Sequence, residues 1–436
     1  ETTVKIRMNE ASADDVATIM YTSGTTGESK GVVLHHFNYL EAMRIHDIRL
    51  PMVNDKDTSM CFLPLTHIFE KAWTCYCLHK GVKIAINQDP KMIQKTLPEV
   101  HPTLMCNVPR FWEKVYVGVH EKINSSAPFM KKIFMDAIET GRLYNLEYKN
   151  KGIEAPFCLK TKFKFYDKTV FTLLKKVLGI ERGRLFPVAG APLSDTVNDF
   201  LQSVNIPIVY GYGLSETTAT VCFYPEIGFQ FGSIGEIMPG VEVKIDESNG
   251  EILVKGKTVT TGYYNKPEEN VRSFTEDGFF RTGDAGRMEG NILFFTERIK
   301  DLYKTSNGKY IAPQAIEIEM GSDKYIEQIA VIGDQRKFVS ALIVPAYALL
   351  EEYAEKKGIA YSSREELLAS NEIIRLIESH IEEHQKNMAS YEKIKRFTLL
   401  PQPFTMEGRE LTDTLKLRRP VVLQKYANEI EAMYAE

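Results

Sequence analysis

The feature that most constrains this chain is a loop rich in glycine, serine and threonine, residues 21–31, with the sequence YTSGTTGESKG. A short apolar run, residues 16–20, leads into the loop, and the β-branched Val32 and Val33 follow it. This order predicts a strand that feeds into a ligand-binding loop. Glycines let the loop backbone turn sharply and approach a ligand, hydroxyl groups offer hydrogen-bond donors, and Lys30 adds a positive charge. Such a loop suits the pyrophosphate end of a nucleotide, whose negative charges need many short hydrogen bonds.

Two other interpretations of the loop can be weighed from its residues. A flexible Gly/Ser linker is disfavoured because the loop directly follows an apolar strand and ends in Lys30 and Gly31 before β-branched residues. A Walker-type ATPase is disfavoured because GxxxxGK[ST] cannot be matched: Lys30 is preceded by Ser29 and followed by Gly31.

A second candidate segment, residues 211–218 with the sequence GYGLSETT, follows the apolar run at residues 207–210. It is expected at a strand end, where α/β folds place their ligand sites. An aromatic ring there can stack on a base, a hydroxyl can reach a phosphate, and a carboxylate can hold a divalent cation. The alternative is a tight turn that caps a helix, because Ser215 and Thr217 are good caps.

Two charged segments, residues 281–284 and 297–301, bracket a predicted hairpin at residues 286–295. The hairpin would bring Asp284 near Arg298. A carboxylate in such a place can accept hydrogen bonds from a ribose diol. The alternative is that both are ordinary surface charges.

The spacing of apolar runs predicts an α/β fold. Strands such as residues 84–86 alternate with longer helical stretches such as residues 127–148, which indicates a largely buried sheet. From about residue 234 to residue 300, short strands punctuated by Asn-Gly, Asp-Gly and Glu-Gly pairs predict a β-rich subdomain.

After residue 301 the pattern returns to mixed structure. Strands near residues 329–332 and 341–344 and a helical stretch around residues 364–385 predict a small α+β domain. We therefore expect a large domain at residues 1–300 and a small carboxy-terminal domain at residues 301–436.

Composition excludes several classes of protein. A net charge of −4 gives no reason to expect a nucleic-acid partner. The sequence has no stretch of about 18 apolar residues and no signal-peptide pattern at its start, which favours the cytoplasm. The six cysteines form no CxxC pair, so we expect reduced thiols in the core and no zinc site.

With these segments in view, the chain resembles the adenylate-forming superfamily, which includes acyl-CoA synthetases, luciferases and the adenylation domains of peptide synthetases. The resemblance extends from residue 16 to residue 420, with the motifs in the family's order. It implies that the phosphate loop grips ATP through Thr22, Ser23, Gly24, Thr25, Thr26, Gly27 and Lys30.

The resemblance also implies roles in the second segment. Tyr212 and Gly213 would flank the adenine, and Thr217 would contact the α-phosphate. Glu216 would bind Mg²⁺ and so take part in catalysis.

The same resemblance implies three further parts of the binding site. Asp284 would hold the ribose with Arg298 beside it, and His67, in residues 63–70, would line the acyl site near the reacting carboxylate. The segment beside the adenine and the acyl group would be Gly190, Ala191 and Pro192.

The resemblance places the catalytic lysine in a carboxy-terminal loop. Lys416 is the candidate, although residues 414–416 read Thr-Leu-Lys where many relatives read Gly-Lys. Long-chain fatty acyl-CoA synthetases tend to share this variant. Asp301 matches the hinge between the family's large and small domains.

The implied reaction has two steps that use ATP, Mg²⁺ and coenzyme A. A carboxylate attacks the α-phosphorus of ATP to give acyl-AMP and pyrophosphate, and a thiol then displaces AMP. Residues 63–71, 108–116 and 261–268 look like the long-chain fatty acid–CoA ligase branch. A medium-chain or aromatic acid, another acceptor, and a non-catalytic scaffold that binds nucleotide remain the alternatives.

Two expectations concern the surroundings of this machinery. Residues 159–180 mix lysines with apolar residues, which fits either peripheral contact with the inner face of a membrane or an ordinary amphipathic helix. Only about twenty residues precede the phosphate loop, where family members carry a long stretch, so the large domain is expected to be incomplete at its amino terminus.

Overall fold

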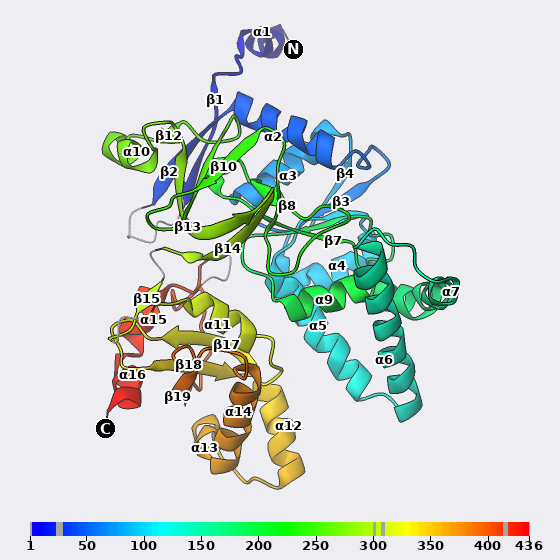
Figure 1. The fold of residues 1–436 in the computed structure, drawn as a ribbon, viewed down its shortest axis with the longest axis vertical. Helices are drawn as coiled ribbons and strands as arrows, with labels where there is room; N and C mark the ends of the chain where they lie inside the picture. The colour runs from blue at the N-terminus through cyan, green and yellow to red at the C-terminus, as the bar shows by residue number, and fades with distance from the viewer. Residues whose placement is uncertain (1, 23–28, 300–301, 307–309, 413–416, 436) are drawn as a thin grey trace. The chain divides into compact units, whose positions relative to one another are not determined.

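The computed structural model describes residues 2–22, 29–299, 302–306, 310–412 and 417–435. The chain divides into two compact units, Glu1–Thr296 and Glu297–Glu436 (Figure 1). Each unit combines helices with sheets, so the predicted α/β fold class is confirmed.

A parallel sheet carries part of the large unit. Strand β3 (Thr58–Cys61) pairs in parallel with β4 (Lys83–Ile86) and with β5 (Leu104–Met105). The connection from β3 to β4 runs through helix α3 (Ile68–His79), as parallel strands require a crossover. The predicted strand at residues 84–86 is therefore confirmed as β4.

The largest sheet has eight strands in the order β10-β11-β13-β14-β9-β8-β7-β6. The parallel pair β6 (Phe186–Val188) and β7 (Ile208–Tyr212) continues into the antiparallel strands β8 (Cys222–Phe223) and β9 (Gly235–Ile237). The other members are β10 (Val241–Ile245), β11 (Glu251–Gly256), β13 (Phe280–Glu289) and β14 (Ile292–Arg298). The β-rich region therefore extends the sheet of the α/β part and is not a separate sheet.

A third sheet holds the phosphate loop. Strand β1 (Val16–Thr22) pairs with β2 (Lys30–His35) in antiparallel fashion, and Thr22 lies opposite Lys30. Strand β12 (Gly262–Tyr263) pairs with the other edge of β2. The predicted strand before the loop is confirmed, and a segment from far along the chain lies next to it (Figure 1).

Helices cover much of these sheets, although the first of them projects away from the sheets (Figure 1). They are α1 (Thr2–Glu10), α2 (His36–Arg49), α3, α4 (Ile93–Val100), α5 (Pro109–Asn124), α6 (Pro128–Arg142), α7 (Phe157–Tyr166), α8 (Thr172–Leu178), α9 (Asp195–Ser203) and α10 (Pro267–Ser273). Short 3₁₀ turns lie at η1 (Pro90–Met92) and η4 (Ser215–Thr217), and π-helical turns at η2 (Leu143–Lys149) and η3 (Asp167–Phe171). The predicted helix at residues 127–148 is therefore α6 continued by η2.

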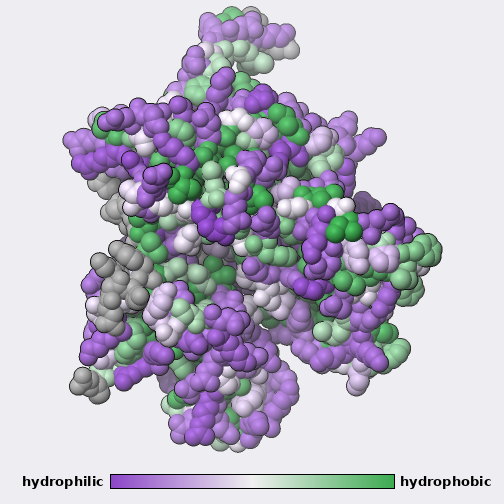
Figure 2. All heavy atoms as spheres, in the orientation of Figure 1, coloured by the Kyte–Doolittle hydropathy of each residue, from purple (hydrophilic) through white to green (hydrophobic). Residues whose placement is uncertain are grey.

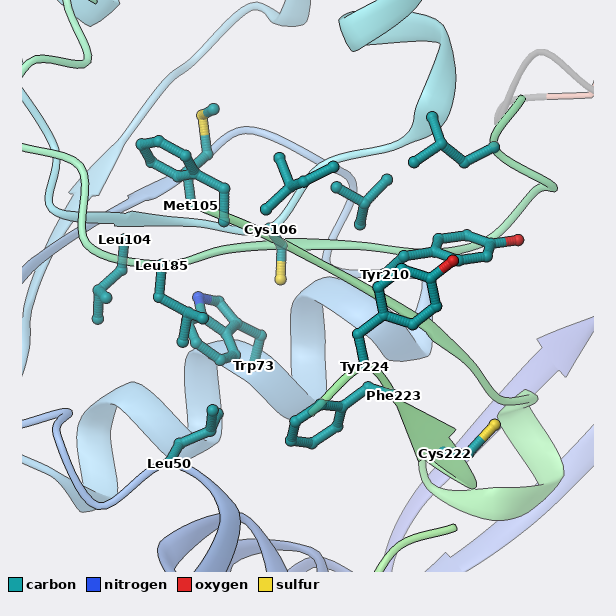
Figure 3. Packing of buried hydrophobic residues seen from close by; sticks show 14 of the residues in the cluster. Leu50, Trp73, Leu104, Met105, Cys106, Leu185, Tyr210, Cys222, Phe223 and Tyr224 are labelled. Atoms are coloured by element: carbon teal, nitrogen blue, oxygen red, sulfur yellow. The ribbon is translucent and has the colours of Figure 1, made fainter. Parts of the chain in front are cut away.

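The core of the large unit is built mainly from apolar side chains of the sheets and their covering helices. Trp112, Phe171 and Phe186 are among its largest fully buried members. Figure 3 shows part of this core, where Leu104 of β5 lies on the same side of the strand as Trp73 of α3 and Met105 points the other way.

The second unit has its own core around a three-stranded sheet. Strand β17 (Ile326–Ile332) pairs with β18 (Val339–Pro345), which pairs in parallel with β19 (Ile394–Leu399), and β15 (Tyr303–Lys304) pairs with β16 (Tyr310–Ile311). Its helices are α11 (Pro313–Met320), α12 (Tyr347–Lys357), α13 (Arg364–Ala369), α14 (Asn371–His384), α15 (Arg419–Lys425) and α16 (Ala427–Tyr434). The predicted strands of this unit are confirmed.

One predicted helix differs in its continuity. The stretch at residues 364–385 is two helices, because Ser370 takes an extended conformation between α13 and α14. The Ser363 side chain accepts a hydrogen bond from the Glu366 amide, which fixes the start of α13.

The predicted burial of the cysteines is wrong for one of them. Cys158 is exposed on α7 and Cys75 is half-buried, whereas the other four are buried. Cys158 lies one residue into a helix whose inward face begins at Phe163, so it points away from the core. Among the described residues, no helix combines the length and the apolar character needed to cross a membrane.

Candidate active site

The two ends of the phosphate loop are held opposite each other by the β1–β2 pair. The Thr22 hydroxyl donates a hydrogen bond to the Lys30 carbonyl over 3.5 Å. Five of the predicted phosphate ligands, namely Ser23, Gly24, Thr25, Thr26 and Gly27, lie outside the described residues.

Lys30 is engaged on two sides. Its ammonium group pairs with the carboxylate of Glu269 on α10 and lies 5.1 Å from the centre of the Tyr263 ring. The charge predicted for the loop is therefore fixed in place and balanced by a carboxylate, which polyanionic phosphates can replace.

Residues 211–218 begin with the last two residues of strand β7 and continue into a tight turn, so they lie at a strand end, as predicted. The Leu214 amide donates to the Thr217 hydroxyl over 2.9 Å, and Thr217 is fully buried. At Gly213, an added Cβ would come within 1.5 Å of the Ala219 carbonyl oxygen. The capping interpretation of Thr217 is therefore realised, and contact with a phosphate stays a prediction.

The Glu216 carboxylate lies at this turn and accepts a hydrogen bond from the Tyr263 hydroxyl over 2.8 Å. The described residues contain no cluster of three or more His, Cys, Asp or Glu side chains suited to a metal ion. Mg²⁺ that arrives with a nucleotide needs only one or two protein carboxylates, because phosphate oxygens and water complete its shell. Glu216 fits that requirement.

The structure brings Tyr212 and Asp284 together. The Tyr212 hydroxyl donates to the Asp284 carboxylate over 2.7 Å, and Asp284 is almost completely buried. Burial and the neighbouring carboxylate raise the pKa of Tyr212 well above its usual value, so the phenol keeps its proton. This pair connects β7 with β13, and an aromatic ring beside a carboxylate suits a nucleoside.

Three predicted residues belong to the second unit. Arg298 ends β14, and its amide donates to the side chain of Glu297 over 2.9 Å. Its place beside Asp284 stays a prediction. Lys416 and the predicted hinge residue Asp301 lie outside the described residues.

The Gly190–Ala191–Pro192 segment follows strand β6. Gly190 has a left-handed backbone with φ of 90°, which favours glycine. The Ala191 carbonyl accepts a hydrogen bond from the Tyr210 hydroxyl over 3.4 Å. The segment is therefore anchored to the neighbouring strand β7.

His67 caps helix α3. Its Nδ1 accepts a hydrogen bond from the Phe69 amide over 3.3 Å, and the side chain is half-buried. Because Nδ1 is an acceptor here, the neutral ring carries its proton on Nε2.

Glu70 is a buried carboxyl group that sequence reasoning did not single out. Its Oε2 accepts from the Leu63 amide over 3.1 Å, and its Oε1 accepts from the Thr74 hydroxyl over 3.4 Å. Burial raises the pKa of Glu70 to about 7. The sequence feature that could have predicted this burial is the position of Glu70 in the apolar first turn of α3, where a carboxyl group is buried and needs hydrogen-bond partners.

An apolar pocket of about 690 Å³, including the space at its mouth, opens beside these segments. Leu50, Trp73, Leu185 and Phe223 line it, and Figure 3 shows them converging from different elements. Gly211 and Tyr212 of the second motif also line it, as does Ala189, which precedes Gly190.

His46 places a polar but uncharged imidazole in the pocket wall. Burial lowers the pKa of His46, and its Nδ1 donates to the Ala42 carbonyl over 2.6 Å. The Thr220 hydroxyl therefore donates to Nε2, over 3.2 Å. The pocket wall holds no charge at neutral pH, which suits an apolar ligand.

Comparison with known protein families gives two matches. Residues 2–264 match the model of the AMP-binding enzyme family, and residues 300–436 match that of the AMP-binding enzyme carboxy-terminal domain.

Known proteins of similar sequence include fatty-acid ligases. The chain is 31% identical over 431 residues to long-chain-fatty-acid–CoA ligase FadD15 of Mycobacterium bovis, covering 98% of this chain and 71% of that protein. It is 30% identical over 458 residues to long-chain-fatty-acid–CoA ligase 1 of Saccharomyces cerevisiae, covering 99% of this chain and 64% of that protein.

Solved structures share the fold. The adenylation domain of a carboxylate reductase from Mycobacterium chelonae superposes with a TM-score of 0.75 at 24% identity, covering 97% of this chain and 61% of that one. O-succinylbenzoate coenzyme A synthetase from Bacillus subtilis, in complex with AMP, gives a TM-score of 0.63 at 20% identity, covering 94% and 69%.

Proposed function

The chain belongs to the AMP-binding enzyme family, and from this premise we propose that it activates a long-chain fatty acid with ATP and transfers the acyl group to coenzyme A. The family is one of adenylate-forming ligases, so the open question is which acid and which acceptor this chain uses. The relatives named above as long-chain-fatty-acid–CoA ligases support the choice at about 30% identity.

The observation that carries the proposal is the apolar pocket beside the nucleotide segments. Helix α2 and its C-cap residue Leu50 line it from Tyr39 to Leu50, a span of about 16 Å at 1.5 Å per residue. Its wall is uncharged, and Gly211 and Tyr212 stand where it meets the second motif. A long alkyl chain would bury its surface there, at about 25 cal/mol for each Å² removed from water.

In the first step, a carboxylate oxygen of the acid would attack the α-phosphorus of ATP while the bond to pyrophosphate breaks. Two anions meet in this step, so Lys30 and Lys416 would neutralise charge, and Asp284 would hold the ribose. Mg²⁺ bound with ATP at Glu216 would supply further positive charge. In the second step, the thiol of coenzyme A would attack the acyl carbonyl and AMP would leave.

The test is to supply MgATP with acids of graded chain length and to measure pyrophosphate release and thioester formation with and without coenzyme A. We expect release to rise with chain length and thioester to form only with coenzyme A. Release without thioester would indicate another acceptor, release that peaks with medium-chain or aromatic acids would indicate another acid, and no release would favour a nucleotide-binding scaffold.

A pocket-filling variant sharpens this test. Ala42 is buried and lines the pocket, so Ala42→Trp should reduce activity with long acids more than with short ones. Leu40 lies on the exposed face of the same helix, so Leu40→Trp is the matched control. Equal losses with every chain length in Ala42→Trp would contradict the assignment of the pocket to the acyl chain.

We further propose that the outer face of residues 157–177 contacts an anionic lipid surface. Four apolar side chains on this face are largely exposed: Phe157 by 84%, Phe165 by 62%, Leu173 by 57% and Val177 by 73%. Their four- and eight-residue spacing follows one face of the α7–η3–α8 stretch. Figure 2 shows green and purple spheres intermingled in the region of α6 and α7.

Lysines accompany this apolar stripe. Lys164, Lys168 and Lys176 are exposed, and among the described residues none of them makes an ion pair. Exposed apolar side chains flanked by free lysines suit an interface with anionic lipids. The triple variant F157S/F165S/L173S should bind phosphatidylglycerol-containing vesicles more weakly in sedimentation, whereas V271S, at a side chain exposed by 80% on α10, should not. Equal binding of both variants would refute the lipid contact.

A further inference from the structure

One segment of the large unit ties the two nucleotide motifs together. Residues 258–264, here called the strap, run alongside residues 216–218. The Thr218 hydroxyl donates to the Thr258 carbonyl over 2.6 Å, and the Thr260 amide donates to the Glu216 carbonyl over 2.7 Å. The strap therefore fixes the backbone that carries Glu216.

The same strap holds the strand that follows the phosphate loop. The Thr260 hydroxyl donates to the Val33 carbonyl over 2.5 Å, and the Tyr264 amide donates to the Gly31 carbonyl over 2.7 Å. Tyr263 lies opposite Val32 in the β2–β12 pair. The strand after the phosphate loop and the turn that carries Glu216 are therefore both hydrogen-bonded to one short segment.

The side chain of Tyr263 completes this connection. Its hydroxyl donates to Glu216 Oε1 over 2.8 Å, and its ring lies 5.1 Å from the Lys30 ammonium. Tyr263 is 7% exposed, and Asn270 holds its backbone through hydrogen bonds of 2.7 and 3.2 Å. The Tyr263 hydroxyl is the donor of this pair, because an ionised carboxylate can only accept a hydrogen bond.

We propose that Tyr263 is a positioning residue that orients the Glu216 carboxylate toward a nucleotide-bound divalent cation while its ring holds the Lys30 ammonium on the phosphate side. This inference rests on the proposed function, because it takes Glu216 and Lys30 as the groups that meet MgATP. It adds a residue that acts through both, since neither the hydroxyl nor the ring of Tyr263 need touch the nucleotide.

The test is calorimetric binding of ATP to the full chain in the absence of acid, with Mg²⁺ and again with EDTA. Tyr263→Phe removes the hydroxyl and keeps the ring beside Lys30. We expect it to lose about tenfold to a hundredfold of the Mg²⁺-dependent affinity, the usual cost of removing a group that orients a metal ligand. Affinity in EDTA should stay within about twofold of wild type. The neighbouring Tyr264 is half-exposed, so Tyr264→Phe is the matched control and should equal wild type in both conditions.

Glu216→Gln, alone and combined with Tyr263→Phe, checks the route of the effect. If Tyr263 acts through Glu216, the double variant should lose no more Mg²⁺-dependent affinity than Glu216→Gln alone. Additive losses would overturn the inference. Equal losses of affinity by Tyr263→Phe with Mg²⁺ and with EDTA would also overturn it, because they would indicate a general structural role. No loss of affinity in either condition would overturn it as well.

Failure of the proposed function gives a different result. Wild-type protein that binds no ATP would overturn the proposed function and this inference with it. Wild-type protein that binds ATP equally with Mg²⁺ and with EDTA would overturn only the inference, because nucleotide binding would persist without a cation-linked role for Glu216.

Discussion

The buried carboxyl group of Glu70 predicts a pH dependence of stability that Glu70→Gln should remove. Burial raises its pKa from the ordinary 4.5 to about 7 in the folded chain. Because the folded pKa is the higher one, the folded state holds this proton more tightly than the unfolded state. The stabilisation is fully present below about pH 4.5 and is lost as the pH rises through about 7. At about 1.4 kcal/mol for each pKa unit, the change amounts to about 3 kcal/mol.

The glutamine variant keeps the shape of the protonated side chain and an oxygen that can accept from the Leu63 amide. Near pH 5 the free energies of unfolding of the variant and the wild type should therefore be similar. At pH 8 the variant should be more stable by up to about 3 kcal/mol. Urea denaturation followed by tryptophan fluorescence measures this difference, because both tryptophans of the chain, Trp73 and Trp112, are buried in the large unit.

An exposed carboxylate serves as the control for this measurement. Glu121 lies exposed on α5, so Glu121→Gln should leave the pH profile of wild type unchanged. The reasoning is refuted if the difference in unfolding free energy between Glu70→Gln and wild type stays constant from pH 5 to pH 8. A variant that loses stability at pH 8 relative to wild type would refute it as well.

Three other substitutions probe the site. Gly213→Ala should lower the melting temperature sharply and weaken ATP binding, because the new Cβ would lie 1.5 Å from the Ala219 carbonyl oxygen. Thermal denaturation measures the change in melting temperature, and an unchanged midpoint would contradict the prediction. Tyr212→Phe removes the hydroxyl that donates to the Asp284 carboxylate and should lower the free energy of unfolding by about 1–3 kcal/mol in urea denaturation. Lys416→Ala should reduce pyrophosphate release at least about a hundredfold while ATP binding persists, and equal release by wild type and variant would exclude Lys416 as the catalytic lysine.

Local patterns in the sequence predicted the strand before the phosphate loop and the strand end that carries Tyr212. Both depend on short runs of apolar residues next to glycine, a signal carried by neighbouring residues. The ion pair of Lys30 with Glu269 joins residues 239 apart, and the sequence contains no mark of that pairing. Such contacts arise only when β12 pairs with β2 and brings α10 beside the loop.

The sequence also did not predict the environment of individual side chains. Glu70 and Thr217 are polar residues in segments singled out for ligand chemistry, and the structure buries both completely. Each has local partners, Leu63 for one and Leu214 for the other. A sequence pattern gives residue types and spacing, but whether a hydroxyl or carboxyl is used by its own turn depends on the packing of distant elements.

The residues predicted to act belong to different units of the chain. Lys30, Glu216 and Asp284 lie in the large unit with the apolar pocket, whereas Lys416 lies in the second unit. Affinity for ATP and for the acid should therefore be set mainly by the large unit, because most of the predicted binding contacts are there. Under the proposed function, Lys416 supplies part of the charge that neutralises the two reacting anions, so the rate of adenylation should also depend on the second unit. A substitution in one unit should then change KM and kcat in different proportions from a substitution in the other.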